Sequence, residues 1–169
     1  MEEDKWNFSN PEPYPPIEIC TRSPAYAKAM LANVGSCASE MTAVSLYLYN
    51  QTILAECEPE IAEIFHRISI VEMKHLSIFC RLSDLLGTDP RLWCYPGRNP
   101  VYWSPRCSRY TREIQELLKN ALYGERQTVE NYCRQCQWIE DEGIVKILKR
   151  IIMDEKCHIE IFQDLLCRY

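Results

Sequence analysis

The stretch Val71-Glu72-Met73-Lys74-His75 lies within residues 59–86, a segment whose apolar side chains recur at alternating spacings of four and three. That spacing is typical of a helix with one face packed into the core of a bundle. Glu72 and His75 occupy two positions of this face, between apolar neighbours. An ionised carboxylate is costly there unless a positive group compensates it. The stretch therefore predicts a buried polar site on a bundle helix.

The same arrangement recurs 83 residues later, where Glu155 and His158 correspond to Glu72 and His75. The apolar positions around the two pairs also correspond: Phe65, Ile68, Phe79 and Leu82 in the first segment, and Leu148, Ile151, Phe162 and Leu165 in the second. Two Glu-x-x-His pairs buried in similar helices suggest that both pairs bind one shared ligand, and a pair of metal ions is the simplest such ligand.

Two single glutamates show a second repeat. Glu40, with Val44 and Tyr47 after it, recurs 85 residues later as Glu125, with the same two residue types at the same spacing in Val129 and Tyr132. The chain is therefore interpreted as two related helical hairpins, an internal duplication.

These patterns predict an all-α fold, a four-helix bundle in which two helical hairpins are joined by a long crossover. Prolines mark an N-terminal tail over residues 1–22, and the bundle is expected over 23–169. The predicted helices cover 23–54, 59–86, 111–138 and about 143–169, with a rigid, aromatic crossover at 87–110.

The spacing of the glutamates agrees with this topology. In an antiparallel hairpin, residues equally far from the turn lie side by side. Glu40 and Glu72 are centred on residue 56, and Glu125 and Glu155 on residue 140; both midpoints fall in predicted turns. Both hairpins should therefore present their carboxylates at the same height.

The sequence thus predicts a dinuclear metal site, because a Glu from each of two helices plus Glu-x-x-His from the other two is a known bundle arrangement for a metal pair. Four carboxylates would neutralise two divalent ions, and mixed carboxylate and imidazole ligands suit iron or manganese. The predicted ligands are Glu40, Glu72, His75, Glu125, Glu155 and His158.

On these residues the chain resembles the ferritin-like proteins of the rubrerythrin and manganese-catalase branch, over roughly residues 23–169. The resemblance implies a centre of two Fe or two Mn ions held by the same six residues. Rubrerythrins usually also carry a rubredoxin-like module and a further glutamate on the third helix. The 169 residues hold no such module, and Leu122 stands where that glutamate is expected.

The leading hypothesis is accordingly a dinuclear oxidoreductase acting on hydrogen peroxide or dioxygen, of catalase or peroxidase type, with an external electron donor if it is a peroxidase. Two alternatives stay open: an iron-binding or storage protein like the ferritins, and a structural, spore-coat-like protein with a relic site. A homodimer or small homo-oligomer is expected.

Composition and charge bear on the possible partners and the location of the protein. A net charge of −5 gives no electrostatic reason to bind nucleic acid, and no apolar run approaches the length of a membrane span. The acidic N-terminus lacks the order of a signal peptide, so a cytoplasmic protein is expected. The ten cysteines are then expected to be free thiols.

The other residues that could carry chemistry are expected to have packing or surface roles. Tyr47 and Tyr132 are expected to pack in the core with hydrogen-bonded hydroxyls, the alternatives being that they order ligands or carry an electron. Cys133 and Cys136 lie inside a predicted helix and are expected to be packed or partly exposed thiols rather than a redox pair. His66 is expected at the surface.

Overall fold

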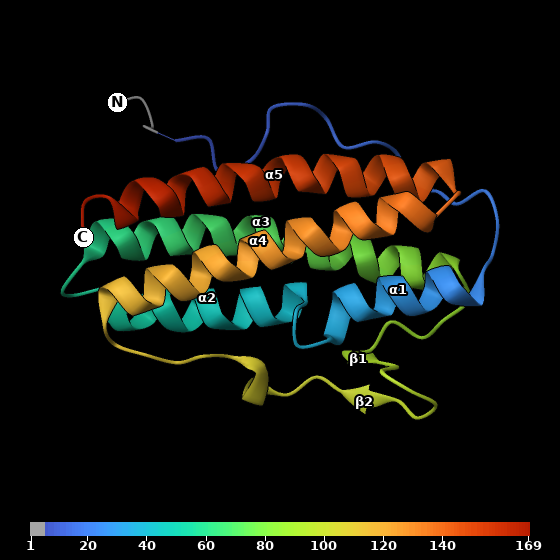
Figure 1. The fold of residues 1–169 in the computed structure, drawn as a ribbon, viewed down its shortest axis with the longest axis horizontal. Helices are drawn as coiled ribbons and strands as arrows, with labels where there is room; N and C mark the ends of the chain where they lie inside the picture. The colour runs from blue at the N-terminus through green and yellow to red at the C-terminus, as the bar shows by residue number, and fades with distance from the viewer. Residues whose placement is uncertain (1–5) are drawn as a thin grey trace.

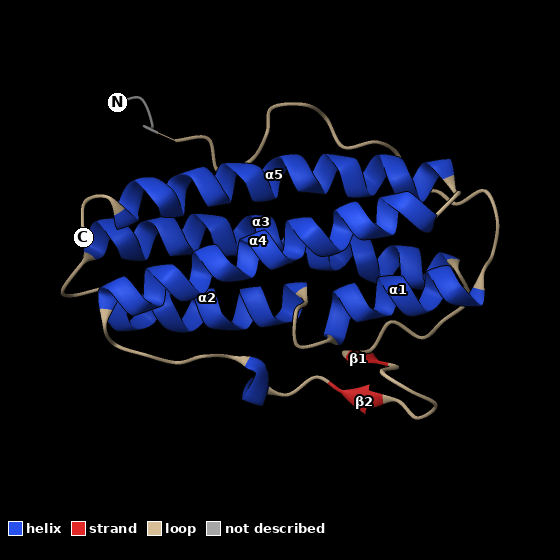
Figure 2. Ribbon diagram, viewed as in Figure 1, coloured by secondary structure: helices blue, strands red, loops and turns tan. Residues whose placement is uncertain are grey.

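The computed structural model describes residues 6–169 and forms a helical bundle with a small two-stranded sheet beside it (Figures 1 and 2). The elements are α1 (Pro24–Gly35), α2 (Glu40–Leu54), α3 (Pro59–Leu85), β1 (Trp93–Cys94), β2 (Val101–Tyr102), a 3-10 turn (Pro105–Cys107), α4 (Ile114–Trp138) and α5 (Glu142–Leu166). The predicted all-α bundle is confirmed. Within the described residues, none of the helices has the length and apolar character needed to cross a membrane.

The two predicted hairpins are present. Helix α2 pairs with α3 through the turn at residues 55–58, and α4 pairs with α5 through residues 139–141. The long crossover returns the chain to the other end of the bundle, so α3 and α4 run in the same direction (Figure 1). Pro59 opens α3, and the Asp141 side chain caps α5 by accepting hydrogen bonds from the backbone N–H groups of Gly143 and Ile144.

The apolar core forms two clusters. One contains Phe79, Leu82 and Ile151, and the other contains Phe65, Ile68 and Phe162. Along the helices, the predicted metal ligands fall between the two clusters. The site is therefore a polar layer with a packed hydrophobic core on either side.

The helix predicted over 23–54 is not continuous. It breaks at residues 36–39, so that α1 ends at Gly35 and α2 begins at Glu40. The crossover packs against the last residue of α1, next to the break: a Cβ on Gly35 would lie 2.6 Å from the backbone nitrogen of Trp93. Trp103 Nε1 also donates a hydrogen bond to Thr42 Oγ1 (2.9 Å). Apolar periodicity is nearly the same on both sides of the break and therefore did not reveal it.

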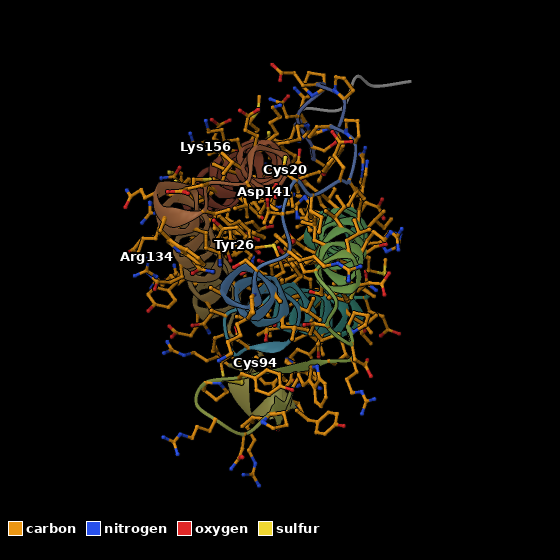
Figure 3. The ribbon with its side chains drawn as sticks, turned by 90° about the vertical axis from the view of Figure 1, so that its right-hand side faces the viewer. Cys20, Tyr26, Cys94, Arg134, Asp141 and Lys156 are labelled. Carbon is orange, nitrogen blue, oxygen red and sulfur yellow. A yellow bond between two sulfur atoms is a disulfide. The ribbon has the colours of Figure 1, made fainter. Side chains whose placement is uncertain are left out.

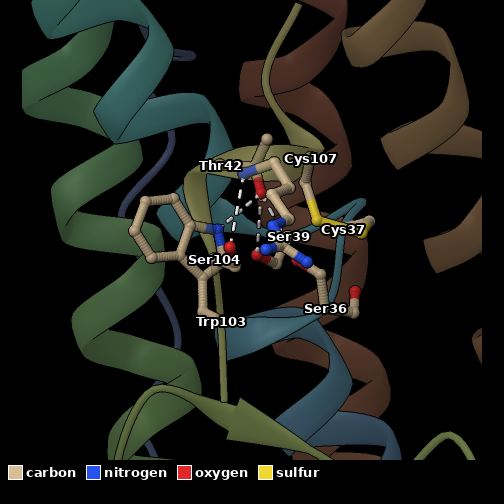
Figure 4. The surroundings of a disulfide bond; sticks show 8 residues. Ser36, Cys37, Ser39, Thr42, Trp103, Ser104 and Cys107 are labelled. Carbon is tan, nitrogen blue, oxygen red and sulfur yellow. Dashed lines mark hydrogen bonds between the residues drawn. A yellow bond between two sulfur atoms is a disulfide. The ribbon is translucent and has the colours of Figure 1, made fainter. Parts of the chain in front are cut away.

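A disulfide joins the break to the crossover (Figure 4). It links Cys37 to Cys107, so the expectation that all ten cysteines are free thiols is wrong for these two. The other eight are free, including Cys133 and Cys136 within α4. The expectation assumed a reducing cytoplasm and took no account of a pair that the fold brings together: Cys37 is exposed at the helix break, beside the 3-10 turn that contains Cys107.

The N-terminal segment from residue 6 to 22 lies along the bundle next to α5 (Figure 1). Trp6 and Phe8 pack against one core cluster and Tyr14 against the other. At the start of α5, the backbone N–H groups of Cys20 and Thr21 donate to Asp141 Oδ2 at 2.7 and 2.9 Å, and Figure 3 shows Cys20 beside Asp141. We call residues 6–22 the N-terminal strap.

Candidate metal centre

The structure brings all six sequence-predicted ligands together in the middle of the bundle. Glu40 comes from α2, Glu72 and His75 from α3, Glu125 from α4, and Glu155 and His158 from α5. Each is at most 2% exposed. Glu40 is the first residue of α2, because the helix break lies directly before it.

The six residues form two overlapping groups of four. In one, ligand atoms of Glu40, Glu72, His75 and Glu155 all lie within 4.8 Å of one another; in the other, those of Glu72, Glu125, Glu155 and His158 do. Glu72 and Glu155 belong to both groups. This arrangement fits two ions that share two carboxylates and each have one further glutamate and one histidine.

The buried oxygens support this fit. Glu72 Oε1 and Glu155 Oε1 accept no hydrogen bond of acceptable geometry, although His158 Nδ1 lies 2.9 Å from the first and His75 Nδ1 lies 3.1 Å from the second. Buried carboxylate oxygens without a donor are costly. Metal ions between the carboxylates and the imidazole Nδ1 atoms would satisfy both kinds of atom.

The electrostatics of the site favour cations. Burial raises the pKa of Glu40 and Glu125 well above the usual range, and the charges of Glu72 and Glu155 raise it further. Burial also acts against the charged forms of Glu72 and Glu155, but the two histidines overcome it and lower the pKa of both carboxyls.

The histidines show the reciprocal shift. Burial disfavours their charged form, yet the surrounding carboxylates raise the pKa of His75 and His158 well above the ordinary value. We call Glu40 and Glu125, which each belong to only one group, the outer glutamates. The raised pKa values of the two histidines and the two outer glutamates favour their protonated forms. Divalent ions that bind here would displace protons and compensate the negative charge of the carboxylates.

Each outer glutamate accepts a hydrogen bond from a tyrosine of the other hairpin. Tyr47 Oη on α2 donates to Glu125 Oε1, and Tyr132 Oη on α4 donates to Glu40 Oε1. Both tyrosines are buried. The expectation of core tyrosines with hydrogen-bonded hydroxyls is confirmed, and their acceptors are two of the candidate ligands.

The sequence reasoning missed a cluster of polar side chains around Nε2 of His75, the ring nitrogen on the outer side of the site. Asp154 Oδ2 lies 3.0 Å from His75 Nε2 and also accepts from Tyr14 Oη, while Asp154 Oδ1 accepts from Arg150 Nη1 at 2.6 Å. Burial opposes ionisation of Asp154, but His75, Tyr14 and Arg150 lower its pKa to about 2. The available signal was an acidic residue directly after the apolar run Ile151-Ile152-Met153 and directly before Glu155.

His158 has a different outer partner. Its Nε2 lies 2.9 Å from the backbone oxygen of Phe8, in the N-terminal strap. With both Nε2 atoms donating outward, both Nδ1 atoms face the carboxylates, which is the orientation a metal ligand needs. Sequence offers no signal for a backbone carbonyl as a partner.

A cavity of about 280 Å³ reaches the site from the surface. Glu72, Glu125 and Tyr47 line its buried part, and the exposed residues Cys37 and Arg109 line it as well. The cavity has room for small molecules but not for a folded partner. His66, Cys133 and Cys157 are not among its lining residues, and His66 is exposed, as expected.

Known proteins show the same architecture. A family model described as Rubrerythrin matches residues 34–166. The manganese catalase KatB from Anabaena PCC7120 superposes with a TM-score of 0.79 at 19% identity, covering 96% of this chain and 80% of KatB. The Rhodobacter capsulatus bacterioferritin, described with a metal-free dinuclear site and haem iron, superposes with a TM-score of 0.72 at 22% identity, covering 88% of each chain. No curated protein sequence matches the chain.

Proposed function

The chain belongs to the rubrerythrin family, and we propose that it is an oxidoreductase whose two iron or manganese ions act on hydrogen peroxide or dioxygen. The observation that carries this proposal is the pair of matched ligand groups sharing Glu72 and Glu155, with a cavity that reaches two of the carboxylates. Ions bridged by carboxylates typically lie about 3.5–4 Å apart, close enough to act on one small molecule together.

The residues would divide the work as follows. Glu40, Glu72, His75 and Glu155 would hold one ion, and Glu72, Glu125, Glu155 and His158 the other. The ions would supply one-electron redox steps and open coordination positions. Tyr47 lines the cavity and donates to Glu125, and burial raises its pKa well above the ordinary value, so the phenol holds its proton beside the site. The two hydrophobic clusters shield the site on either side along the bundle.

Metal analysis and peroxide turnover on the same purified sample test this function. Two irons or manganeses per chain, with oxygen released from hydrogen peroxide in the absence of any donor, would identify a catalase. Peroxide reduction that needs an added reductant would identify a peroxidase, and consumption of dioxygen with a reductant an oxidase. Two bound ions with none of these activities would overturn the enzyme proposal.

A matched pair of variants separates the site from the fold. Glu72→Gln removes a shared carboxylate, and we expect it to abolish binding of at least one ion and all turnover. Glu130→Gln, on the exposed face of α4, changes the same residue type away from the site and should leave metal content and turnover unchanged.

Iron storage is the second candidate, supported by the structural similarity to the bacterioferritin. It predicts that the chain assembles into a large hollow particle that takes up many more irons than two per chain. Light scattering and iron loading decide this point: a dimer or small oligomer that stops at two ions per chain would exclude storage.

A further inference from the structure

The internal duplication fails at one buried position next to the ligands. The offset of 83 residues that relates Glu155 to Glu72 and His158 to His75 relates Asp154 to Val71. Asp154 is fully buried, whereas Val71 is partly exposed. The two hairpins therefore supply the same ligands but different surroundings.

Asp154 gives His75 an anionic partner. Its Oδ2 accepts from His75 Nε2 at 3.0 Å, and Tyr14 Oη donates to the same oxygen. The other oxygen, Oδ1, accepts from Arg150 Nη1 and from the backbone N–H of Asn10, at 2.6 and 2.7 Å. The carboxylate is thus held in place by four donors, and the oxygen nearest His75 is the one that Arg150 does not contact.

His158 has a neutral partner in the corresponding place, the backbone oxygen of Phe8 at 2.9 Å. The hydrogen bonds to the outer glutamates and the Nδ1 distances within each Glu-x-x-His pair match in the two halves. Each outer glutamate accepts from a tyrosine of the other hairpin, and each histidine Nδ1 lies 3.2 Å from the glutamate three residues before it.

A carboxylate that accepts a hydrogen bond from the Nε2–H of a ligating histidine makes Nδ1 a stronger electron-pair donor to the metal. A backbone carbonyl has a smaller effect, because hydrogen bonds to a charged acceptor are stronger than those to a neutral one. We propose that the two metal positions are unequal, and that the ion beside Glu40 and His75 binds first and more tightly than the ion beside Glu125 and His158. This inference rests on the proposed dinuclear function. It makes Asp154 a positioning residue that acts through His75.

Two measurements together test the proposal. One is a calorimetric titration of the metal-free protein with Mn²⁺, and the other is the crystallographic location of the first ion that binds. Repulsion between two cations can separate the binding steps by itself, so the position of the first ion matters. Crystals grown with one equivalent of Mn²⁺ should show anomalous scattering beside Glu40 and His75. In Asp154→Asn the tighter step should weaken by roughly 10- to 100-fold, with the weaker step unchanged.

Asp141→Asn is the matched control. Asp141 is likewise a buried aspartate that holds the strap, through the backbone N–H groups of Cys20 and Thr21, but it contacts no histidine. This variant should leave both binding steps unchanged.

Three results would overturn the inference: a first ion beside His158, equal weakening of both steps in Asp154→Asn, or the same weakening in Asp141→Asn. Each of these leaves the dinuclear site itself intact. Failure of the wild-type protein to bind any Mn²⁺ or Fe²⁺ would instead overturn the proposed function together with this inference.

Discussion

Tyr47 on α2 donates a hydrogen bond to Glu125 on α4, a residue of the other hairpin. The relationship is mirrored by Tyr132 and Glu40. Each tyrosine follows the glutamate of its own helix by seven residues, about 10 Å along the axis and too far for a direct bond. Because α2 and α4 run antiparallel (Figure 1), the tyrosine of each helix, seven residues after its own glutamate, lies level with the glutamate of the other helix.

The first prediction concerns this pair of bonds. Tyr47→Phe and Tyr132→Phe should each weaken Mn²⁺ binding by roughly 10- to 100-fold, because an outer glutamate loses the donor that orients it. Calorimetric titration of the metal-free variants measures the change. Phe79→Leu, a buried substitution in the core beside Tyr132, is the control for packing, and a similar loss of affinity in it would contradict the interpretation.

The second prediction is a pH dependence of metal affinity. The pKa values of His75 and His158 are raised by the adjacent carboxylates, and those of Glu40 and Glu125 by burial. These groups hold protons below their raised pKa values, and an ion must displace them. Affinity for Mn²⁺ should therefore rise with pH.

Binding constants measured between about pH 6 and pH 8, with calorimetry in buffers of different ionisation enthalpy, report the protons released. We expect more than one proton per ion at the lower pH. A constant affinity over this range, or one that falls as the pH rises, would contradict the shifts.

The third prediction concerns the disulfide. Cys37 and Cys107 are separated by 70 residues, and the bond closes a loop that contains all of α3. Replacing both residues by serine should lower the free energy of unfolding by about 2–4 kcal/mol, since the unfolded chain is no longer constrained. Urea denaturation measures this change. A reductant should destabilise the wild-type protein but not the double variant. Cys133→Ser is the control: because Cys133 forms no disulfide, this variant should respond to the reductant as the wild-type protein does.

The fourth prediction tests the close contact between the end of α1 and the crossover. Gly35→Ala would place a Cβ within 3 Å of the backbone atoms of Leu92 and Trp93, which cannot move as a flexible side chain can. The variant should be destabilised and the crossover displaced. Gly124→Ala is the control: it lies within α4 with open space around its Cβ, and helix propensity predicts stabilisation of up to about 1 kcal/mol. Equal melting temperatures for the two variants would refute the close contact.

Much of the fold and the candidate site could be predicted from local pattern. Glu72 and His75 stand out because they interrupt an apolar helical face, and Glu155 and His158 repeat the interruption. The symmetric distances of the glutamates from the two turns set them at one height. These are consequences of helical periodicity and hairpin geometry, and the structure places all six residues in one buried cluster.

The helix break could not be predicted in this way. Residues 36–39 carry no proline, and the glutamate that follows sits where a continuous apolar face would have put it. Next to the break, the backbone of the crossover lies against Gly35, and this contact forms only after the chain has folded back along the bundle. The pairing of Cys37 with Cys107 follows from the same packing.

The sequence by itself determined the four-helix architecture and the candidate ligands, because periodicity within a helix decides which side chains face the core. The tertiary structure alone decided what surrounds those ligands: the tyrosine of the opposite hairpin on each outer glutamate, Asp154 on one histidine and the Phe8 carbonyl on the other. Hydrogen bonds between distant segments depend on how helices and strap pack, and no local pattern encodes that packing.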